Sequence, residues 1–280
     1  MIPAAFEYER PTTIEGALSA LAGGDAKVLA GGMSLLPLMK LRLAQPGRLV
    51  DIGRLSELKG AGPTDEGGFQ VGALVTYTEA MAATALDFAR DCISQIGDVQ
   101  VRNRGTVGGA IAHADPASDL PALALALDYS VVLRSARGER VVPLDGFLTG
   151  AFSSAMGPDE ILTALRRGPL PGGARGAYRK LAHPASGYSI VGVCAVVASA
   201  GDSVSHARVA ITGVGEVAYR AKAVEAALMG SDGSASAVAA AAAHAAEGQT
   251  VNSDIYADRA YRSTMAEVYT RRAIEAALGR

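Results

Sequence analysis

The chain has 280 residues, of which 49% are hydrophobic and 19% are charged, and its formal net charge is -2. This length is enough to bury the core of one large domain or two modest ones, and the absence of a basic surplus argues against nucleic acid as a partner. No basic segment followed by an apolar core opens the sequence, and no apolar run is long enough to span a bilayer, so we expect a cytoplasmic protein that reaches a membrane only through a complex.

Cysteine and histidine usage limits the metal chemistry of the chain. Its two cysteines, Cys92 and Cys194, lie far apart in apolar or helix-like surroundings, so we expect free thiols rather than a disulfide. An iron–sulfur cluster needs about four thiolates, which two cysteines cannot supply. The four histidines lack metal-ligand spacing, and a metal site made by this chain alone is not expected.

Helices and strands alternate in the N-terminal segment. Apolar periodicity and capping residues predict a helix over 14–21 that is capped by Thr12 or Thr13, a strand over 27–30, a helix over 35–42 and a strand over 49–53. Between the first strand and the second helix stand Ala30-Gly31-Gly32-Met33-Ser34. The order strand, glycine pair, helix suits a phosphate cradle, but it also suits a plain turn.

A second glycine-rich segment, Arg104-Gly105-Thr106-Val107-Gly108-Gly109, is interpreted as a loop within residues 100–119. Glycine permits a tight turn and a close approach to another group, and successive backbone N–H groups can bind an anion. Arg102 and Arg104 favour negative charge nearby. A tight surface turn is the alternative for this segment alone, whereas two such segments together indicate a ligand with two polar regions, such as a dinucleotide.

Asp119 follows this loop, in His113-Ala114-Asp115-Pro116-Ala117-Ser118-Asp119. An aspartate before a predicted helix over 122–127 is commonly its N-cap. It is also a candidate to bind ribose hydroxyls.

Strands and helices are segregated in the second half of the chain. Before residue 167 the sequence predicts a strand over 69–75, helices starting at Tyr77 and over 87–96, and a hairpin of 130–134 with 139–143. A Pro/Gly-rich stretch over 167–173 then marks the candidate domain boundary. Three antiparallel strands are then predicted over 177–181, 188–199 and 206–212, followed by helices near 221–229, 235–246 and 258–278. This order indicates an α+β fold.

The segment Gly213-Val214-Gly215-Glu216-Val217-Ala218 fits a dinucleotide-binding fingerprint of the Rossmann type. Such a unit needs a further parallel strand after its helix, whereas another Ala-rich helix follows here. We therefore do not assign it a binding role.

Three motifs together resemble one family. The three motifs are Ala30 to Pro37 with Lys40-Leu41-Arg42, the segment 100–109 and the segment 113–119. They are similar to the FAD-binding medium subunit of molybdenum hydroxylases of the aerobic carbon monoxide dehydrogenase type. This subunit is a relative of the xanthine dehydrogenase flavoprotein. The resemblance covers essentially the whole chain. The sequence departs from the family at two positions. Met33 stands where relatives often have His or Gln, and Ala110 stands where they often have a polar residue.

The resemblance implies a two-subdomain FAD-binding domain of the PCMH or vanillyl-alcohol-oxidase type over 1–174, with subdomains of about 1–55 and 56–174. A C-terminal domain over 175–280, like that of carbon monoxide dehydrogenase flavoproteins, would hold the three-stranded antiparallel sheet and the helices.

The same resemblance implies the site residues. FAD would contact Ala30, Gly31, Gly32, Met33 and Ser34 in the first segment, and Thr106, Val107, Gly108, Gly109 and Ala110 in the second. Asp119 would contact the ribityl or ribose region, Leu162 and Lys180 would approach the flavin, and Tyr188 would lie near the isoalloxazine. The alternatives are a strand-edge cation in water for Lys180 and a half-buried core aromatic for Tyr188. No catalytic or metal-binding residue is implied.

The implied function is that of an oxidoreductase subunit for electron transfer. A large molybdopterin subunit would oxidise the substrate, a small subunit with [2Fe-2S] clusters would relay electrons, and FAD would pass them to a quinone, a cytochrome or another acceptor. A dimer of heterotrimers and carbon monoxide as substrate are expected. The alternatives are a medium subunit for an N-heterocycle or aldehyde hydroxylase, a stand-alone FAD-dependent oxidoreductase, and a non-catalytic assembly subunit.

Overall fold

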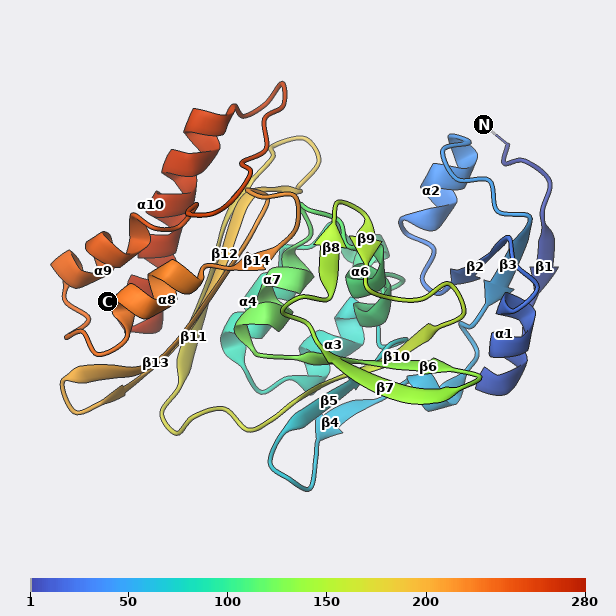
Figure 1. The fold of residues 1–280 in the computed structure, drawn as a ribbon, viewed down its shortest axis with the longest axis horizontal. Helices are drawn as coiled ribbons and strands as arrows, with labels where there is room; N and C mark the ends of the chain where they lie inside the picture. The colour runs from blue at the N-terminus through green and yellow to red at the C-terminus, as the bar shows by residue number, and fades with distance from the viewer. Residues whose placement is uncertain (1) are drawn as a thin grey trace.

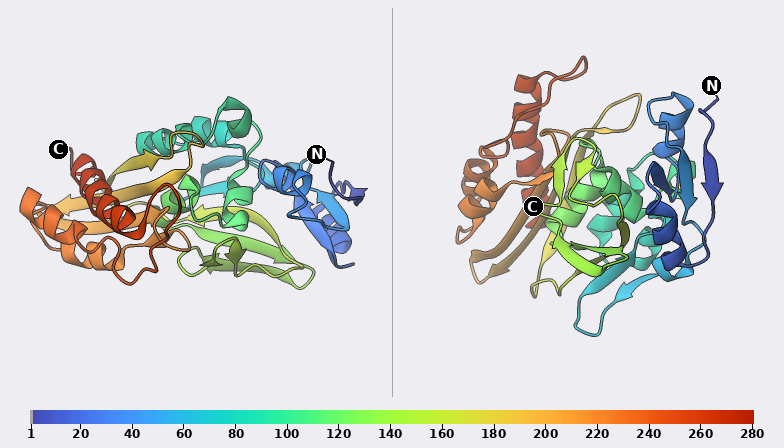
Figure 2. Two further views of the ribbon diagram at one scale, coloured as in Figure 1. Left: turned by 90° about the horizontal axis from the view of Figure 1, so that it is seen from above. Right: turned by 45° about the vertical axis from the view of Figure 1, so that its right-hand side comes forward.

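The computed structural model describes residues 2–280 and shows three parts in a row, with the two termini in the end parts (Figures 1 and 2). The N-terminal part contains a parallel sheet of order β1-β3-β2. Its elements are β1 (Glu7–Glu9), α1 (Ile14–Leu21), β2 (Ala26–Leu29), α2 (Leu35–Lys40), β3 (Arg48–Asp51) and the 3₁₀ helix η1 (Ser56–Leu58).

Helix α1 covers this sheet through its buried apolar face. The side chain of Thr13 accepts a hydrogen bond from the Gly16 N–H group, so Thr13, one of the two predicted residues, is the N-cap. Ile14, Ala17, Leu18 and Leu21 recur at helical spacing and pack with Val50 and Ile52. The short strand β1 was not among the predicted elements.

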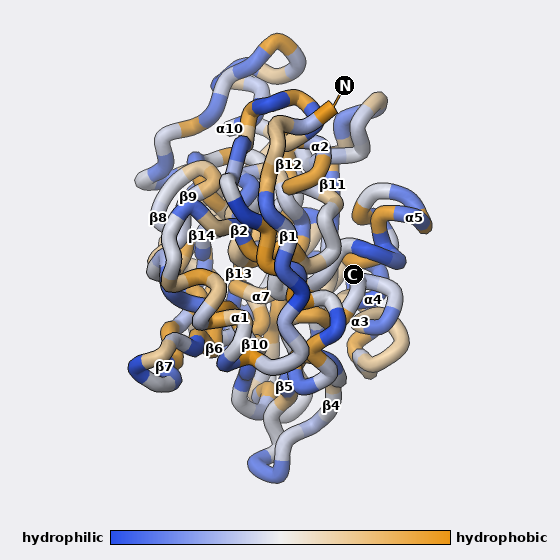
Figure 3. Tube along the Cα trace, turned by 90° about the vertical axis from the view of Figure 1, so that its right-hand side faces the viewer, coloured by the Kyte–Doolittle hydropathy of each residue, from blue (hydrophilic) through white to orange (hydrophobic). Residues whose placement is uncertain are grey.

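The central part is built on an antiparallel sheet of order β4-β5-β10-β6-β7. Its strands are β4 (Ala61–Pro63), β5 (Phe69–Gly72), β6 (Ser130–Ser135), β7 (Gly138–Pro143) and β10 (Ile161–Arg167), and β8 (Leu148–Gly150) pairs separately with β9 (Ser153–Ser154). The polar tips of the β4–β5 and β6–β7 hairpins point away from the body of the molecule (Figure 3).

Five helices of the central part lie between β5 and β6 in sequence: α3 (Tyr77–Ala83), α4 (Asp87–Ser94), α5 (Val99–Arg102), α6 (Val107–His113) and α7 (Asp119–Ala126). Thr76 and Glu79 form a capping box at α3, as expected from the predicted cap. Two predictions were wrong. Gly108 and Gly109 lie in the first turn of α6 rather than in a loop, and the helix predicted from residue 122 begins at Asp119.

The C-terminal part has a four-stranded antiparallel sheet, β11-β12-β13-β14, and the prediction of three strands was one short. The missed strand has only two residues. The elements are β11 (Arg175–Ala182), β12 (Ser189–Ala200), β13 (Ser203–Thr212), β14 (Tyr219–Arg220), α8 (Lys222–Leu228), α9 (Ala235–Ala242) and α10 (Arg259–Ala277). Residues 213–218 join two antiparallel strands, which confirms that they do not form a Rossmann unit.

Both faces of the C-terminal sheet are buried, which explains the continuous apolar sequence of β12. Val191 and Val193 pack toward α8, α9 and α10, whereas Cys194 and Val196 join the core of the central part. The segment 168–174 connects β10 to β11, and the division of the chain at residue 174 stays a prediction.

Hydrogen bonds from the end of the C-terminal sheet hold the segment before α7. The Thr212 hydroxyl lies 2.8 Å from the carbonyl oxygens of both Pro116 and Ser118, and the Gly213 N–H group donates to Pro116 at 2.8 Å. Thr212 is fully buried, so water cannot replace its hydroxyl group at this contact.

Replacing Thr212 by Val should therefore destabilise the protein by about 1–3 kcal/mol, because it keeps the shape of the side chain but removes the hydroxyl that holds the Ser118 carbonyl, while the Pro116 carbonyl keeps the Gly213 N–H group. Urea unfolding followed by circular dichroism measures the change. Thr264→Val is the matched control, since the Thr264 hydroxyl bonds Ala260 on the exposed surface of α10. Equal free energies of unfolding for the two variants would contradict the prediction.

Candidate functional site

The two glycine segments meet through their backbones. An ideal Cβ placed on Gly31 would lie 2.0 Å from the carbonyl oxygen of Arg104, and Gly32 has a φ of +78°. A side chain at position 31 is therefore sterically excluded, and position 32 favours glycine because of its left-handed conformation. The turn from β2 to α2 in the N-terminal part thus lies against the segment that leads into α6.

The first turn of α6 is bound to the central part by its own backbone. The N–H groups of Val107 and Gly108 donate to the carbonyl oxygens of Val75 and Ala73, at 2.9 and 3.0 Å. An ideal Cβ on Gly108 would lie 2.5 Å from the Cβ of Ala73, so glycine allows this approach. The N–H group of Gly109 donates to the Thr106 hydroxyl oxygen and that of Ala110 to the Thr106 carbonyl.

This pairing corrects the interpretation of residues 107–110 as an array of free N–H groups. Their amide hydrogens are all used inside the chain, and the glycines there serve packing. Arg102 likewise donates to the carbonyl oxygens of Ile96 and Gly97. Arg104 is exposed and forms no ion pair with any of residues 2–280.

The turn from β2 to α2 has the opposite character. The five consecutive N–H groups from Gly31 to Leu35 donate no hydrogen bond to any residue that the structure describes. Ser34 is the N-cap of α2, yet its side chain caps no N–H group of that helix within the described chain. Gly31, Gly32 and Ser34 are half-buried and Met33 is 38% exposed. A row of unpaired donors in this position is suited to an anion.

Asp119 lies at the centre of a buried polar cluster that joins the central and C-terminal parts. Its Oδ1 accepts hydrogen bonds from the hydroxyls of Tyr178 and Ser189, the latter at 2.7 Å. Its Oδ2 accepts from Lys180 Nζ at 2.9 Å, and Lys180 also donates to the Gln95 carbonyl at 3.1 Å. Ser118, and not Asp119, is the N-cap of α7, so the interpretation of Asp119 as an N-cap was wrong.

The Lys180 side chain is 2% exposed, so it is not the strand-edge cation in water that was the alternative. Burial, together with the charge of Asp119, raises the pKa of the Tyr178 hydroxyl far above its usual range, which keeps it protonated as a donor. Tyr178 and Ser189 were not among the site residues predicted from the sequence. Strand alternation could have suggested Tyr178, because it lies two residues from Lys180 on β11 and projects to the same face.

Tyr77 packs against the second glycine segment and is near enough to Asp119 to feel its charge, whereas from the sequence it was predicted only as the start of a helix. An ideal Cβ on Gly105 would lie 2.7 Å from the Tyr77 ring. Burial raises the pKa of Tyr77, and the nearby charges of Asp119 and Asp115 add to this effect. The same two carboxylates act on Tyr188, whose pKa is raised first by burial.

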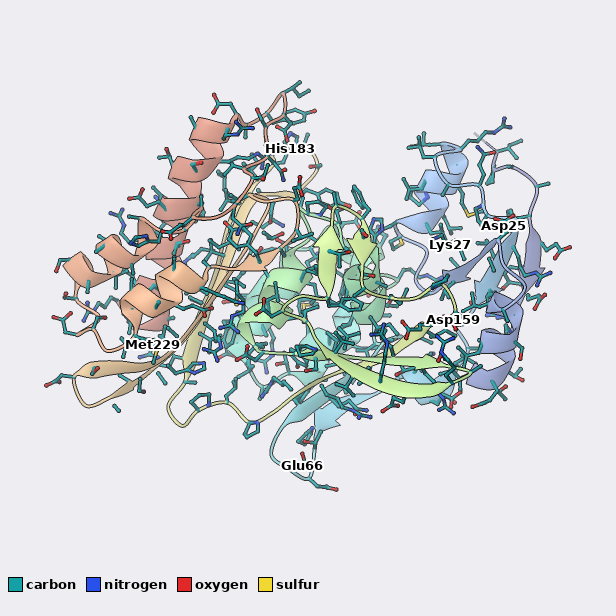
Figure 4. The ribbon with its side chains drawn as sticks, viewed as in Figure 1. Asp25, Lys27, Glu66, Asp159, His183 and Met229 are labelled. Atoms are coloured by element: carbon teal, nitrogen blue, oxygen red, sulfur yellow. The ribbon has the colours of Figure 1, made fainter. Side chains whose placement is uncertain are left out.

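Tyr188 is 50% exposed and directly precedes Ser189 of the cluster. It ends the β11–β12 connection, which begins at His183 (Figure 4), and the His183 N–H group donates to the Tyr188 carbonyl at 2.8 Å. The His183 ring lies edge-on to Tyr256, with 4.1 Å between the ring centroids.

Leu162 differs from the other predicted site residues, because its side chain is 5% exposed and packs in the central core beside a bulge in β10.

The structure adds three observations on metals, thiols and membranes. Cys92 and Cys194 are buried free thiols, as expected. Across residues 2–280, no three His, Cys, Asp or Glu side chains gather in a way that could hold a metal ion. Over the same range no helix combines the length and apolarity needed to cross a membrane.

Comparison with known proteins assigns the chain to a family. A family model described as the FAD-binding domain in molybdopterin dehydrogenase matches residues 4–167. A second, described as the CO dehydrogenase flavoprotein C-terminal domain, matches residues 176–277. The chain belongs to the family of FAD-binding medium subunits of molybdenum hydroxylases. It is therefore an FAD-binding oxidoreductase subunit.

Individual relatives match over their full length. The chain is 38% identical to the carbon monoxide dehydrogenase medium chain of Hydrogenophaga pseudoflava, covering 100% of this chain and 99% of that one. It is 34% identical to the 6-hydroxypseudooxynicotine dehydrogenase complex subunit alpha of Paenarthrobacter nicotinovorans, covering 100% and 97%. The solved structure of carbon monoxide dehydrogenase from H. pseudoflava matches with a TM-score of 0.96 at 38% identity, covering 100% and 99%.

Adding a side chain at Gly31 should separate the two glycine segments. We expect Gly31→Ala to lower the free energy of unfolding by about 1–3 kcal/mol, because its Cβ can be accommodated only by backbone movement. Gly62→Ala is the control, since a Cβ there would meet no atom within 4 Å. Urea unfolding of both variants tests the expectation, which fails if Gly31→Ala is as stable as its control.

Acid should destabilise the protein partly through His113, the last residue of α6. Burial lowers the pKa of His113 from its usual 6.5, and the charge of Asp115 opposes this only in part. Below pH 6.5 His113 therefore binds a proton more readily in the unfolded chain than in the folded chain. The contribution of neutral His113 to the free energy of unfolding is complete above this pH and is lost as the pH falls.

Unfolding free energies at pH 7.5 and 5.5 test this, with His113→Gln as the variant. The variant should lose less stability between the two pH values than the wild type. His206 is unchanged in both proteins, so its own lowered pKa cancels in the comparison. An identical loss in the two proteins would rule out a contribution from His113.

Proposed function

We propose that this chain is the FAD-binding electron-transfer subunit of a molybdenum hydroxylase that oxidises carbon monoxide. The observation that carries the proposal is the row of unpaired N–H groups from Gly31 to Leu35, in a chain that belongs to an FAD-binding family. The substrate is inferred from the 38% identity to a carbon monoxide dehydrogenase medium chain.

The residues of the turn from β2 to α2 fit the pyrophosphate of FAD. An anion placed there would satisfy donors that the protein leaves open, and Gly31 and Gly32 permit its approach because neither carries a Cβ. When bound, FAD accepts electrons singly and releases them in pairs. The protein contributes the position and the electrostatic surroundings of the cofactor.

The other proposed contacts take different roles. Thr106, Val107, Gly108, Gly109 and Ala110 would form a rigid wall beside the pyrophosphate, since the amide groups of residues 107–110 are already paired. The Asp119–Lys180 pair would set the charge near the ribityl chain and the flavin. Tyr188, half-exposed next to that pair, would cover the isoalloxazine, and Leu162 would approach it through the bulged backbone of β10.

The partners follow from what this chain lacks. Two buried thiols cannot hold iron–sulfur clusters, so a small [2Fe-2S] subunit would deliver the electrons and a large molybdopterin subunit would oxidise the substrate. A dimer of heterotrimers, located in the cytoplasm or held against a membrane by the complex, would pass electrons to a quinone or a cytochrome. The relative named for 6-hydroxypseudooxynicotine supports a nitrogen-containing organic substrate as the second candidate.

Anaerobic spectroscopy of the purified proteins tests this function. The chain with FAD alone should keep its oxidised flavin absorption under carbon monoxide, and addition of the two partner subunits should bleach it. Bleaching by carbon monoxide without partners would overturn the assignment as an electron-transfer subunit. Bleaching of the complete complex by an N-heterocycle but not by carbon monoxide would move the assignment to the second candidate.

Removing the Ser34 hydroxyl should weaken FAD binding without unfolding the protein. A charge-assisted hydrogen bond contributes about 1.5–3 kcal/mol, so we expect Ser34→Ala to raise the Kd for FAD about tenfold or more. Fluorescence titration of the chain with FAD measures this. Ser56→Ala, an exposed serine of η1, is the control. An unchanged Kd for Ser34→Ala would remove this hydroxyl from the site.

A further inference from the structure

A small apolar cavity lies between the central sheet and helices α3, α4, α6 and α7. Its volume is about 50 Å³. Its floor consists of buried aliphatic side chains, which include Val71, Ile93, Leu123, Leu127 and Leu165. No residue of the Asp119 cluster lines it, and of the proposed FAD contacts only Val107 does, so the cavity borders the proposed FAD site without containing it.

The rim of the cavity differs from its floor, because it carries Arg167 between two aromatic rings. The Arg167 guanidinium carbon lies 5.7 Å from the ring centroid of Phe69 and 6.0 Å from that of Tyr129. Rings at this distance attract the cation through their electron-rich faces. All three residues line the cavity and are half-buried.

Arg167 is left with unused donors. One terminal nitrogen donates to the Gly168 carbonyl at 2.9 Å, whereas Nε is buried and has no hydrogen-bond partner. No Asp or Glu within residues 2–280 forms an ion pair with Arg167. The neighbouring Arg166 is different, because it bonds Gln70 at 2.6 Å and lies 3.6 Å from Glu139.

A buried donor without a partner is unfavourable, and a weakly hydrated guanidinium flanked by aromatic rings suits a carboxylate. The apolar floor beside it suits a hydrocarbon chain, and the small volume limits that chain to a few carbon atoms. We propose that this cavity binds a short aliphatic carboxylate, with its chain on the apolar floor and its carboxylate at Arg167. The proposal does not depend on the function proposed for the FAD site.

Titration of the full chain with butyrate tests the proposal by NMR. Butyrate should bind saturably in the millimolar range and shift the methyl resonances of Ile93 and Leu123. Acetate, which lacks the chain, and 1-butanol, which lacks the charge, should each bind at least about tenfold more weakly, since each loses one of the two interactions. No saturable binding of butyrate, or equal binding of acetate, would overturn the proposal.

Two neighbouring arginines provide a matched pair of variants. Arg167→Gln should weaken butyrate binding about tenfold or more, whereas Arg166→Gln on the same strand should leave it unchanged. Equal Kd values in these two variants would refute a role for Arg167. Thermal melts check that both proteins are folded, and the methyl shifts of the wild type decide the location of binding if Arg167→Gln does not fold.

Discussion

The approach of Gly31 to the Arg104 carbonyl is the constraint on which the arrangement of the N-terminal and central parts depends. Only a residue without a Cβ fits there, because the neighbouring group is backbone and cannot rotate away. Gly105 lies against the Tyr77 ring and Gly108 against Ala73, where an added Cβ would likewise be too close. The three glycines thus place the turn from β2 to α2, helix α3 and helix α6 in one compact unit.

The Asp119 cluster plays the corresponding role between the central and C-terminal parts. Removal of a carboxylate and an ammonium group from water is costly, and the cost is offset only when the remaining lone pairs and protons find partners. Here Tyr178, Ser189 and the Gln95 carbonyl supply those partners. The cluster therefore requires α7, β11 and β12 to be in register, and a shift of β11 by one residue would move Lys180 to the other face of the sheet.

Much of the fold could be predicted from the sequence because the signals were local. Helix α1 has its cap and apolar spacing, the β6–β7 hairpin has its turn, and α10 has an N-cap at Asp258. Elements without such signals were missed. Strand β1 consists of Glu7, Tyr8 and Glu9, with no apolar alternation, and it is a strand because β3 offers it a parallel edge.

The site was predicted only in part, for a related reason. The position of the motifs could be read from the sequence, but the partner of each N–H group could not, because it depends on which strand ends lie nearby. The glycines at 108 and 109 therefore resembled a ligand cradle although their amide groups bind Ala73 and Thr106. Tyr178 was missed because its partner lies 59 residues away in sequence.

The difference between the two glycine segments has a consequence for how the site works. A paired backbone segment such as 107–110 is held from both sides and can define a fixed wall, whereas the unpaired turn from Gly31 to Leu35 leaves its hydrogen-bonding capacity to a ligand. An unpaired, half-buried row of donors is unfavourable by itself, and a bound anion removes that penalty. Binding at the turn should thus stabilise the contact between Gly31 and Arg104, so that the ligand strengthens the same junction that positions it.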